Sequence, residues 1–175
     1  MAEYLMGIDA GTGSVRVALF DFRGQNRAYA VAEYGTTYPK NGWAEQSDYE
    51  WFEALKKAIP ECIKKAGIAA DNIAAITCDA TTNTLVYLDE NDTSVRPPIL
   101  WMDVRATEEA SFIDTIREEY DATKFYKPGF RADTMVPKCM WVKKNEPENW
   151  AKTKTIMEFE DWLNWKKKKK KTVSM

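Results

Sequence analysis

The N-terminal segment constrains the fold of this chain more than any other part of the sequence. An apolar run at residues 4–8 ends in Asp9, a turn with two glycines follows, and β-branched and aromatic residues resume at 15–21. This pattern predicts two antiparallel strands joined by a tight turn. A second turn at 23–26 and an alternating segment at 27–33 predict a third antiparallel strand.

Helix and strand patterns alternate in the rest of the chain. Ser47 and Glu50 form a capping box ahead of apolar residues at helical spacing, and Gly67 fits the position after that helix. Pro60 predicts a kink or a break within it. Two further strands are expected at 72–78 and 84–88, and three further helices at 107–120, 136–144 and 158–165. This order predicts an α/β fold with a mixed sheet and flanking helices.

The turn of the first hairpin carries groups that suit a phosphate. Glycines let the backbone N–H groups approach phosphate oxygens, and a carboxylate beside them suits a hydrated Mg²⁺ that bridges nucleotide phosphates. The residues that offer such groups are Asp9, Gly11, Thr12, Gly13, Ser14 and Arg16. The turn matches neither a Walker A loop nor a Rossmann fingerprint, because a strand follows the glycines where both motifs require a helix. An ordinary glycine-containing hairpin is the alternative.

The composition excludes several kinds of site. The chain has no histidine, so Ser-His and Cys-His nucleophiles and histidine-based metal sites are excluded. The three cysteines, Cys62, Cys78 and Cys139, are widely spaced and predict neither a disulfide framework nor a zinc site. We expect them to be reduced packing residues.

The charges are distributed unevenly. Six of the 25 basic residues form the run 166–171, and without it 19 basic residues stand against 27 acidic ones, a net charge of −8. An acidic body argues against nucleic-acid binding. No apolar run approaches the about 18–20 residues that span a bilayer, so we expect a cytoplasmic protein without a membrane partner. We interpret residues 166–175 as a disordered or artefactual lysine-rich tail.

Five segments resemble, in this order, sequence blocks of the FGGY carbohydrate kinases, the family of glycerol, xylulose, ribulose and fuculose kinases. The segments are 7–21 (GIDAGTGSVRVALFD), 42–46 (GWAEQ), 76–86 (ITCDATTNTLV), 98–106 (PILWMDVRA) and 137–147 (PKCMWVKKNEP). A later helix at 160–163 (EDWL) also resembles the family. The resemblance implies a ribonuclease H-like fold of the actin/hexokinase superfold, with an incomplete N-terminal kinase domain over residues 1–165.

The resemblance also implies ATP-dependent phosphorylation of a sugar hydroxyl with Mg²⁺ as cofactor. Asp9 would hold the Mg²⁺, and Gly11, Thr12, Gly13 and Ser14 would line the nucleotide phosphates, with Arg16 near the phosphate path. An actin- or Hsp70-like ATPase also begins with such a hairpin. The segments 42–46 and 98–106 do not fit that branch.

Four residues are expected to contact the substrate: Thr82, Asn83, Trp101 and Asp103. Thr82 and Asn83 stand where glycerol kinases carry Arg-Glu and xylulose kinases carry Met-His, and this chain matches neither pair. Trp101 and Asp103 would wall the same cleft. The alternatives are that Trp101 belongs to the core and that Asp103 forms a structural ion pair with Arg105.

The substrate class is suggested by the segment 79–81. Its residues are closer to the ribulose and xylulose kinases than to glycerol kinase, so a ketopentose is the expected substrate, with glycerol or another polyol as the alternative. Asp79 itself is interpreted as structural.

The family's general base, an aspartate, and its adenine pocket are expected downstream of this chain. Family members are much longer, and the change to lysines at 166 suggests a truncation, a frame shift or an engineered terminus. We therefore expect no catalytic residue in this chain and weak or no kinase activity from it alone. A non-catalytic, self-associating form such as a homodimer is a further alternative, because half of the sheet would be uncovered.

Overall fold

The computed structural model of the chain describes residues 3–121 and 129–168. The chain divides into two compact units that interleave along the sequence. The first unit contains Met1–Thr36, Ser47–Thr81 and Glu160–Met175, and the second contains Thr37–Gln46 and Thr82–Phe159. Each unit has its own sheet and its own buried side chains.

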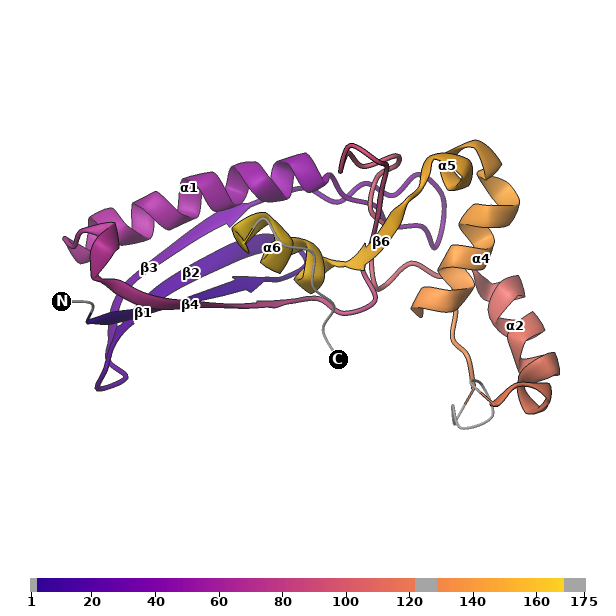
Figure 1. The fold of residues 1–175 in the computed structure, drawn as a ribbon, viewed down its shortest axis with the longest axis horizontal. Coiled ribbons are helices and arrows are strands. Elements are labelled where there is room, and N and C mark those ends of the chain that lie inside the picture. Colours follow the sequence, from indigo (N-terminus) through magenta and orange to yellow (C-terminus); the bar gives the residue numbers. More distant parts are fainter. Residues whose placement is uncertain (1–2, 122–128, 169–175) are drawn as a thin grey trace. The chain divides into compact units, whose positions relative to one another are not determined.

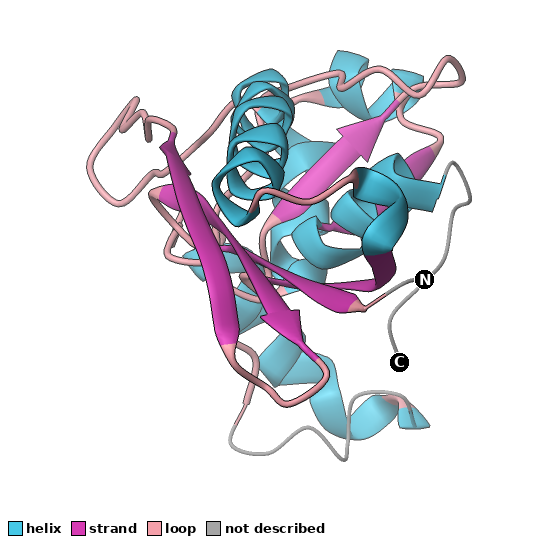
Figure 2. Cartoon of the chain, turned by 90° about the vertical axis from the view of Figure 1, so that its left-hand side faces the viewer, coloured by secondary structure: helices cyan, strands magenta, loops and turns pink. Residues whose placement is uncertain are grey.

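The first unit is built on a four-stranded mixed sheet in the order β3-β2-β1-β4. Its strands are β1 (Tyr4–Ala10), β2 (Ser14–Asp21), β3 (Asn26–Glu33) and β4 (Ile73–Ala80). The first three strands form an antiparallel meander, and β4 pairs in parallel with β1 after the helical crossover (Figures 1 and 2). The predicted hairpin, third strand and mixed sheet are confirmed.

Helix α1 (Asp48–Ala66) begins where the sequence predicts it. Ser47 Oγ accepts a hydrogen bond from the Glu50 N–H at 3.4 Å, which is the N-cap interaction. Glu50 does not complete the predicted capping box, because its carboxylate accepts a hydrogen bond from the Gly35 N–H at 3.2 Å. Glu50 therefore ties the segment after β3 to the start of α1.

Helix α1 continues past Pro60 without the predicted break and ends at Gly67. Gly67 has a φ of 66° and donates its N–H to the carbonyl of Lys64. This is the left-handed C-terminal cap that glycine adopts without steric cost. A single proline in a helix of 19 residues is tolerated here because its neighbours pack on the sheet.

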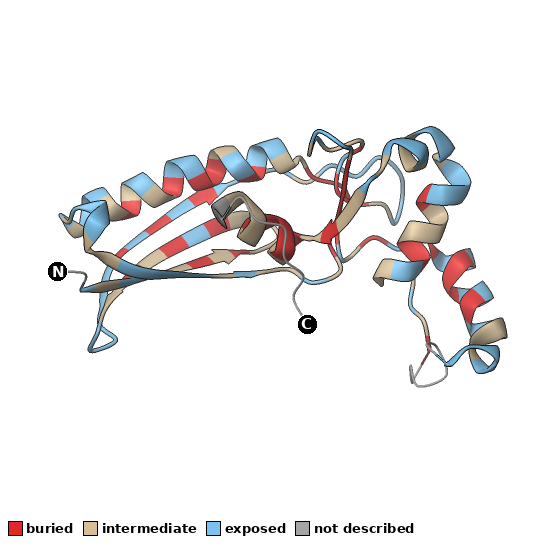
Figure 3. Ribbon diagram, in the orientation of Figure 1, coloured by how far each residue is buried: buried red, intermediate tan, exposed pale blue. Residues whose placement is uncertain are grey.

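The core of the first unit lies between α1 and one face of the sheet. Alternate residues of β1, β2 and β3 are buried on this face, as a strand period of two requires, and the buried residues of α1 lie on the side toward the strands (Figure 3). Helix α6 (Phe159–Lys168) adds Trp162, which packs edge-to-face on Trp51 with ring centroids 5.5 Å apart.

The beginning of the lysine run is helical. Helix α6 extends to Lys168, so the first three lysines continue a helix, which differs from the expected disordered tail starting at 166. The rest of that expected tail, residues 169–175, lies outside the described residues.

The second unit contains a small antiparallel sheet of β5 (Leu85–Leu88) and β6 (Thr155–Glu158). The helical elements of the second unit are α2 (Thr107–Ile116), η2 (Arg117–Glu119), α4 (Met135–Asn145) and α5 (Pro147–Lys152). The buried hydrophobic cluster of the second unit consists of Leu85, Tyr87, Ile99 and Val142. In the first unit, the short η1 (Ala70–Asn72) precedes β4. The predicted helices are confirmed, although α2 ends before 120, while β6 and α5 were not predicted.

Candidate functional site

The turn of the β1–β2 hairpin is fixed by hydrogen bonds to its backbone. The Gly11 N–H donates to the Ser14 carbonyl at 3.0 Å. Tyr34, which follows β3, donates its hydroxyl to the Gly11 carbonyl at 2.5 Å and its backbone N–H to the Gly13 carbonyl at 3.2 Å. The turn is therefore held from both sides.

Tyr34 is a supporting residue that the sequence did not reveal. Burial, reinforced by the negative charge of Asp9, raises the pKa of Tyr34 well above its ordinary value, so its hydroxyl remains a donor at neutral pH. The sequence gives only an indirect indication that Tyr34 lies beside the turn. The register pairs Ser14 with Glu33, which places the next residue of the chain beside the turn.

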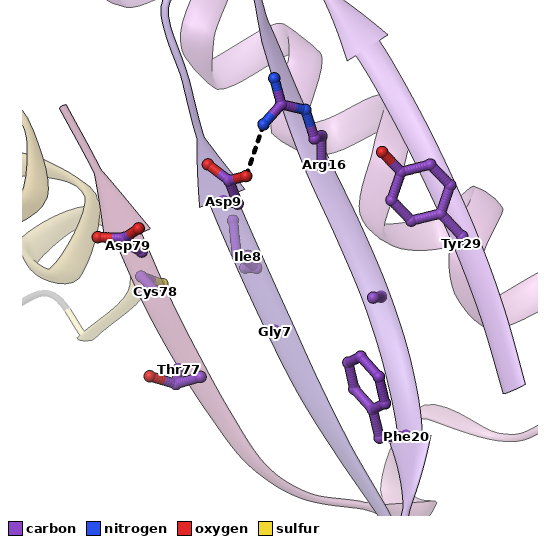
Figure 4. Close-up of a pocket in the computed structure, with 10 residues that line it drawn as sticks. Gly7, Ile8, Asp9, Arg16, Phe20, Tyr29, Thr77, Cys78 and Asp79 are labelled. Carbon is purple, nitrogen blue, oxygen red and sulfur yellow. Dashed lines mark hydrogen bonds and ion pairs between the residues drawn. The ribbon is translucent and has the colours of Figure 1, made fainter. Parts of the chain in front are cut away.

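Asp9 and Arg16 face each other across the hairpin. They are a register pair of β1 and β2, and Arg16 Nη1 lies 2.6 Å from Asp9 Oδ2 (Figure 4). The Asp9 side chain is 48% exposed and that of Arg16 is 46% exposed. The hydrogen bond to Asp9 raises the pKa of Arg16 above its ordinary value. Both groups remain accessible to a ligand, and solvent weakens their attraction.

A second carboxylate lies beside Asp9. Asp79 is its register partner on β4, and Figure 4 shows the two carboxylates at the ends of neighbouring strands. Asp9, Arg16, Thr77 and Asp79 all line one groove of about 350 Å³. Asp79 was interpreted as structural, but it is exposed and opens on the same groove as Asp9.

The hairpin residues fit a hydrated magnesium ion. The described residues contain no group of three or more His, Cys, Asp or Glu side chains arranged to hold a metal. Mg²⁺ does not need one, because it keeps several waters and binds through one or two carboxylates together with substrate phosphates. Asp9, with Asp79 beside it, offers hard oxygen ligands of this kind.

The expected sugar contacts belong to the second unit. Thr82 and Asn83 form the turn that leads into β5. Asn83 has a φ of 55°, its N–H donates to Glu158 Oε2 at 3.2 Å, and its carbonyl accepts from Lys138 Nζ at 2.7 Å. Asn tolerates the left-handed conformation better than most residues. The backbone of the turn is thus hydrogen-bonded to Glu158 and Lys138, while Thr82 is exposed.

Lys138 connects this turn to Trp101. Its fully buried ammonium also donates to the carbonyl of Leu100 at 2.8 Å, so one cation joins Asn83 to the residue before Trp101. Burial lowers the pKa of Lys138 to about 8, although Asp103 opposes this shift. Trp101 itself is 42% exposed, and its backbone N–H donates to Thr84 Oγ1 at 3.2 Å. The alternative that Trp101 is a core residue is therefore wrong.

Asp103 does not occupy the position expected of a substrate contact. Its side chain is fully buried, and both carboxylate oxygens accept hydrogen bonds from Arg105, which contributes its backbone N–H, Nε and Nη2 at 2.7–2.9 Å. The Ala44 N–H adds a fourth donor at 2.7 Å. No accessible lone pair is left for a sugar hydroxyl. The structure therefore corrects the assignment of Asp103 and supports the structural ion pair with Arg105.

This ion pair belongs to a buried network of charges. Glu45 Oε1 lies 2.8 Å from Arg105 Nη1 and 2.6 Å from Arg96 Nη2, and Arg96 Nε donates to Glu146 Oε2 at 2.8 Å. The guanidinium of Arg105 also lies over the ring of Trp43 at 4.0 Å. The network joins three of the segments singled out in the sequence, 42–46, 98–106 and 137–147.

The predicted site residues thus form two groups. Asp9, Gly11, Thr12, Gly13, Ser14 and Arg16 lie together on the hairpin of the first unit. Thr82, Asn83 and Trp101 lie around Lys138 in the second unit. Cys62 is buried and Cys78 and Cys139 are half-buried, and none of the three forms a disulfide with another described cysteine. None of the helices in residues 3–121 and 129–168 combines the length and apolar composition needed to cross a bilayer.

Known proteins with similar sequences and structures include xylulose kinases and glycerol kinases. The chain is 33% identical over 161 residues to the xylulose kinase of Lactococcus lactis, covering 92% of this chain and 32% of that protein. It is 30% identical over 173 residues to the glycerol kinase of Oleidesulfovibrio alaskensis, covering 94% and 34%. The crystal structure of a xyloylose kinase from Brucella ovis superposes with a TM-score of 0.85 at 26% identity, covering 93% and 34%.

These similarities define the class of protein and then the family. The fold is the actin/hexokinase type of α/β fold found in sugar kinases. The chain belongs to the FGGY family of carbohydrate kinases, since residues 4–175 match the N-terminal domain of that family. It spans about a third of the length of the curated relatives that it matches.

Proposed function

We propose that this chain supplies the phosphate-binding hairpin and part of the sugar-binding wall of an ATP-dependent kinase that phosphorylates a sugar hydroxyl. The observation that carries the proposal is the hairpin itself. Asp9 and Arg16 flank a glycine turn whose carbonyls at Gly11 and Gly13 are bonded to Tyr34, and whose residue Gly13 is exposed. Backbone N–H groups in such a turn bind anions.

Each hairpin residue has a distinct role in this proposal. Thr12, Gly13 and Ser14 donate hydrogen bonds to nucleotide phosphates, while Gly11, whose N–H is bonded to the Ser14 carbonyl, leaves room for the phosphates to approach. Arg16 attracts their negative charge. Asp9 holds the Mg²⁺, which when bound neutralises phosphate charge. The base that accepts the proton of the sugar hydroxyl is not assigned to any described residue.

The sugar contacts come from Thr82, Asn83 and Trp101. The exposed Trp101 ring packs on the C–H face of a sugar, and the side chains of Thr82 and Asn83 bond its hydroxyls. The similarity to xylulose kinases supports a ketopentose such as xylulose or ribulose as the substrate. Glycerol is the second candidate, because glycerol kinases are similar over the same part of the chain.

Nucleotide binding is tested on the chain itself. Mg·ATP is titrated into ¹⁵N-labelled protein, and the amides of residues 9–16 are expected to shift in a saturable, Mg²⁺-dependent way. Asp9→Asn should weaken the Mg²⁺-dependent part by at least about tenfold, as expected for loss of a metal ligand. Asp71→Asn, which removes an exposed carboxylate from η1, is the matched control. Shifts that avoid the hairpin, or equal effects of both variants, would refute the assignment.

Substrate class is tested by ligand-observed NMR. Saturation transfer to xylulose and ribulose should exceed transfer to glycerol, and Trp101→Ala should abolish the difference. Stronger transfer to glycerol than to either ketopentose would favour the second candidate. Transfer to none of the three would contradict a sugar-binding role for the 82–83 turn in this chain.

A further inference from the structure

A second groove lies in the first unit, away from the phosphate hairpin. It has a volume of about 370 Å³, within the range of small-ligand sites. Helix α1 forms one wall, α6 forms the other, and β1 and β4 form the floor. It lies on the face of the sheet that α1 covers, because Ile8 is buried on that face whereas Asp9, the next residue of β1, lies on the other face.

The lining of this groove is almost entirely hydrocarbon. The apolar residues come from all four elements: Ile8, Phe52, Leu55, Ile59, Pro60, Ile76 and Leu163, with the thiol of Cys78 beside them. Leu55 and Leu163 are buried, while Phe52 and Ile76 are each 40% exposed. Within residues 3–121 and 129–168 these side chains form a continuous apolar slot, and a hydrocarbon chain that filled it would remove this surface from water.

The rim of the groove carries two lysines and no carboxylate. Lys56 is already paired with Glu53 at 2.8 Å. The ammonium of Lys166 instead lies 4.4 Å from the ring centre of Trp165, 5.3 Å from that of Trp162 and 5.8 Å from that of Phe52. Among residues 3–121 and 129–168, no carboxylate forms an ion pair with Lys166. The aromatic rings hold this cation at the mouth of the slot.

We propose that this groove binds a free amphipathic carboxylate, with its alkyl chain between α1 and α6 and its head group on Lys166. The charge of the rim selects the head group, because an anion is attracted to Lys166 and a cationic amphiphile is repelled. The apolar slot selects an unbranched or lightly branched alkyl chain over a sugar or nucleotide. The proposal does not rest on the proposed kinase function, because none of the hairpin residues assigned to phosphate or Mg²⁺ lines this groove, although Ile8 and Cys78 line both grooves.

Binding is tested by calorimetric titration of the whole chain with octanoate, decanoate and dodecanoate below their micelle concentrations. One molecule should bind per chain, and the affinity should rise about fourfold for each CH₂ that enters the groove, until the groove is full. Decanol should bind more weakly than decanoate, and decyltrimethylammonium more weakly still. Equal binding of the anionic and cationic probes, or no saturable binding of any, would overturn the proposal.

Two variants separate the head-group contact from the slot. Lys166→Gln should reduce decanoate affinity about threefold to fivefold, the range of a partly exposed ion pair, and leave decanol unchanged. Lys64→Gln, which alters an exposed lysine of α1 outside the groove, should change neither. Ile59→Trp should block all chain lengths by filling the slot. An unchanged affinity in Ile59→Trp would place the ligand elsewhere.

A measurement on the unaltered chain keeps the test independent of how Ile59→Trp folds. Decanoate should slow the alkylation of Cys78, which lines the groove, and leave that of Cys139 unchanged, as read by peptide mass mapping. If the chain binds anionic vesicles but no free carboxylate, the occupant is a membrane surface. If the chain is a dimer by light scattering and decanoate leaves its mass unchanged, the occupant is a second copy. Either result would refute the proposal.

Discussion

Replacing Lys138 with methionine should change how the stability of this chain depends on pH. Lys138 is fully buried, and its ammonium donates to the carbonyls of Asn83 and Leu100. Burial lowers its pKa in the folded chain to about 8, against an ordinary value of 10.5. Methionine fills a similar volume and cannot titrate, so the comparison isolates the proton.

The sign and size of the effect follow from these two values. Between about pH 8 and 10.5 the unfolded chain holds the proton more often than the folded chain, so the free energy of unfolding rises with pH. Below about pH 8 both states are protonated and the contribution is constant. The shift corresponds to about 3 kcal/mol over the whole window, of which about 2 kcal/mol is reached by pH 9.5.

The assay is urea unfolding followed by tryptophan fluorescence at pH 7 and pH 9.5. The protein that keeps Lys138 should gain about 2 kcal/mol relative to Lys138→Met between these pH values. Burial raises the pKa of Cys62 and of the two tyrosines Tyr34 and Tyr87, which lowers stability at high pH, but these contributions are common to both proteins and cancel. Both proteins carry Cys139→Ser, because Lys138 also influences the pKa of that thiol.

Lys64→Met is the control, since this lysine of α1 is exposed. It should show no pH-dependent difference from the unaltered chain. A difference for Lys138→Met that is equally small, below about 0.5 kcal/mol, would show that burial does not depress the affinity of Lys138 for its proton and would refute the reasoning.

Two further predictions concern the stability of turns: one tests the hydroxyl of Tyr34, and the other compares two glycines with a positive φ. Tyr34→Phe removes the hydroxyl bonded to the Gly11 carbonyl and should lower the free energy of unfolding by about 1 kcal/mol in urea unfolding, whereas an unchanged value would show that the bond does not hold the turn. Gly42→Ala and Gly24→Ala should each cost about 1–2 kcal/mol, because both glycines have a positive φ. Gly42→Ala should cost more, because its Cβ would lie 2.9 Å from Val104 Cγ2 while that of Gly24→Ala meets open space; equal costs in thermal unfolding would contradict this.

The elements predicted well from the sequence are those that depend on local interactions. The first hairpin was predictable because its alternation and its turn glycines lie within one segment. Helix α1 was predictable because Ser47 and Gly67 mark its two ends. The pairing of β5 with β6 was not, because β6 has four residues and lies about 70 positions further along the chain. Nothing in so short a run reveals a distant partner.

The candidate site was predicted unevenly for a related reason. The sequence places Trp101 and Asp103 in the same block. It does not show that the carboxylate of Asp103 accepts hydrogen bonds from Arg105 and Ala44, or that the side chain of Trp101 is exposed. Lys138 escaped prediction because its partners are backbone carbonyls, which any residue provides. Asp79 gained its importance only through the register of β4 on β1.

Because of the charge network around Glu45, three of the sequence blocks of this family are not independent of one another. Glu45 holds two guanidinium groups, those of Arg96 and Arg105, and replacing it alone would leave both buried without that counter-charge. Removing one partner of a buried ion pair is strongly destabilising. Natural variation in the segments 42–46, 98–106 and 137–147 should therefore be correlated, with compensating changes appearing together. For the same reason, the joint presence of these three segments in a new sequence indicates one shared packing arrangement, whereas our proposal assigns the choice of sugar to the turn at Thr82 and Asn83.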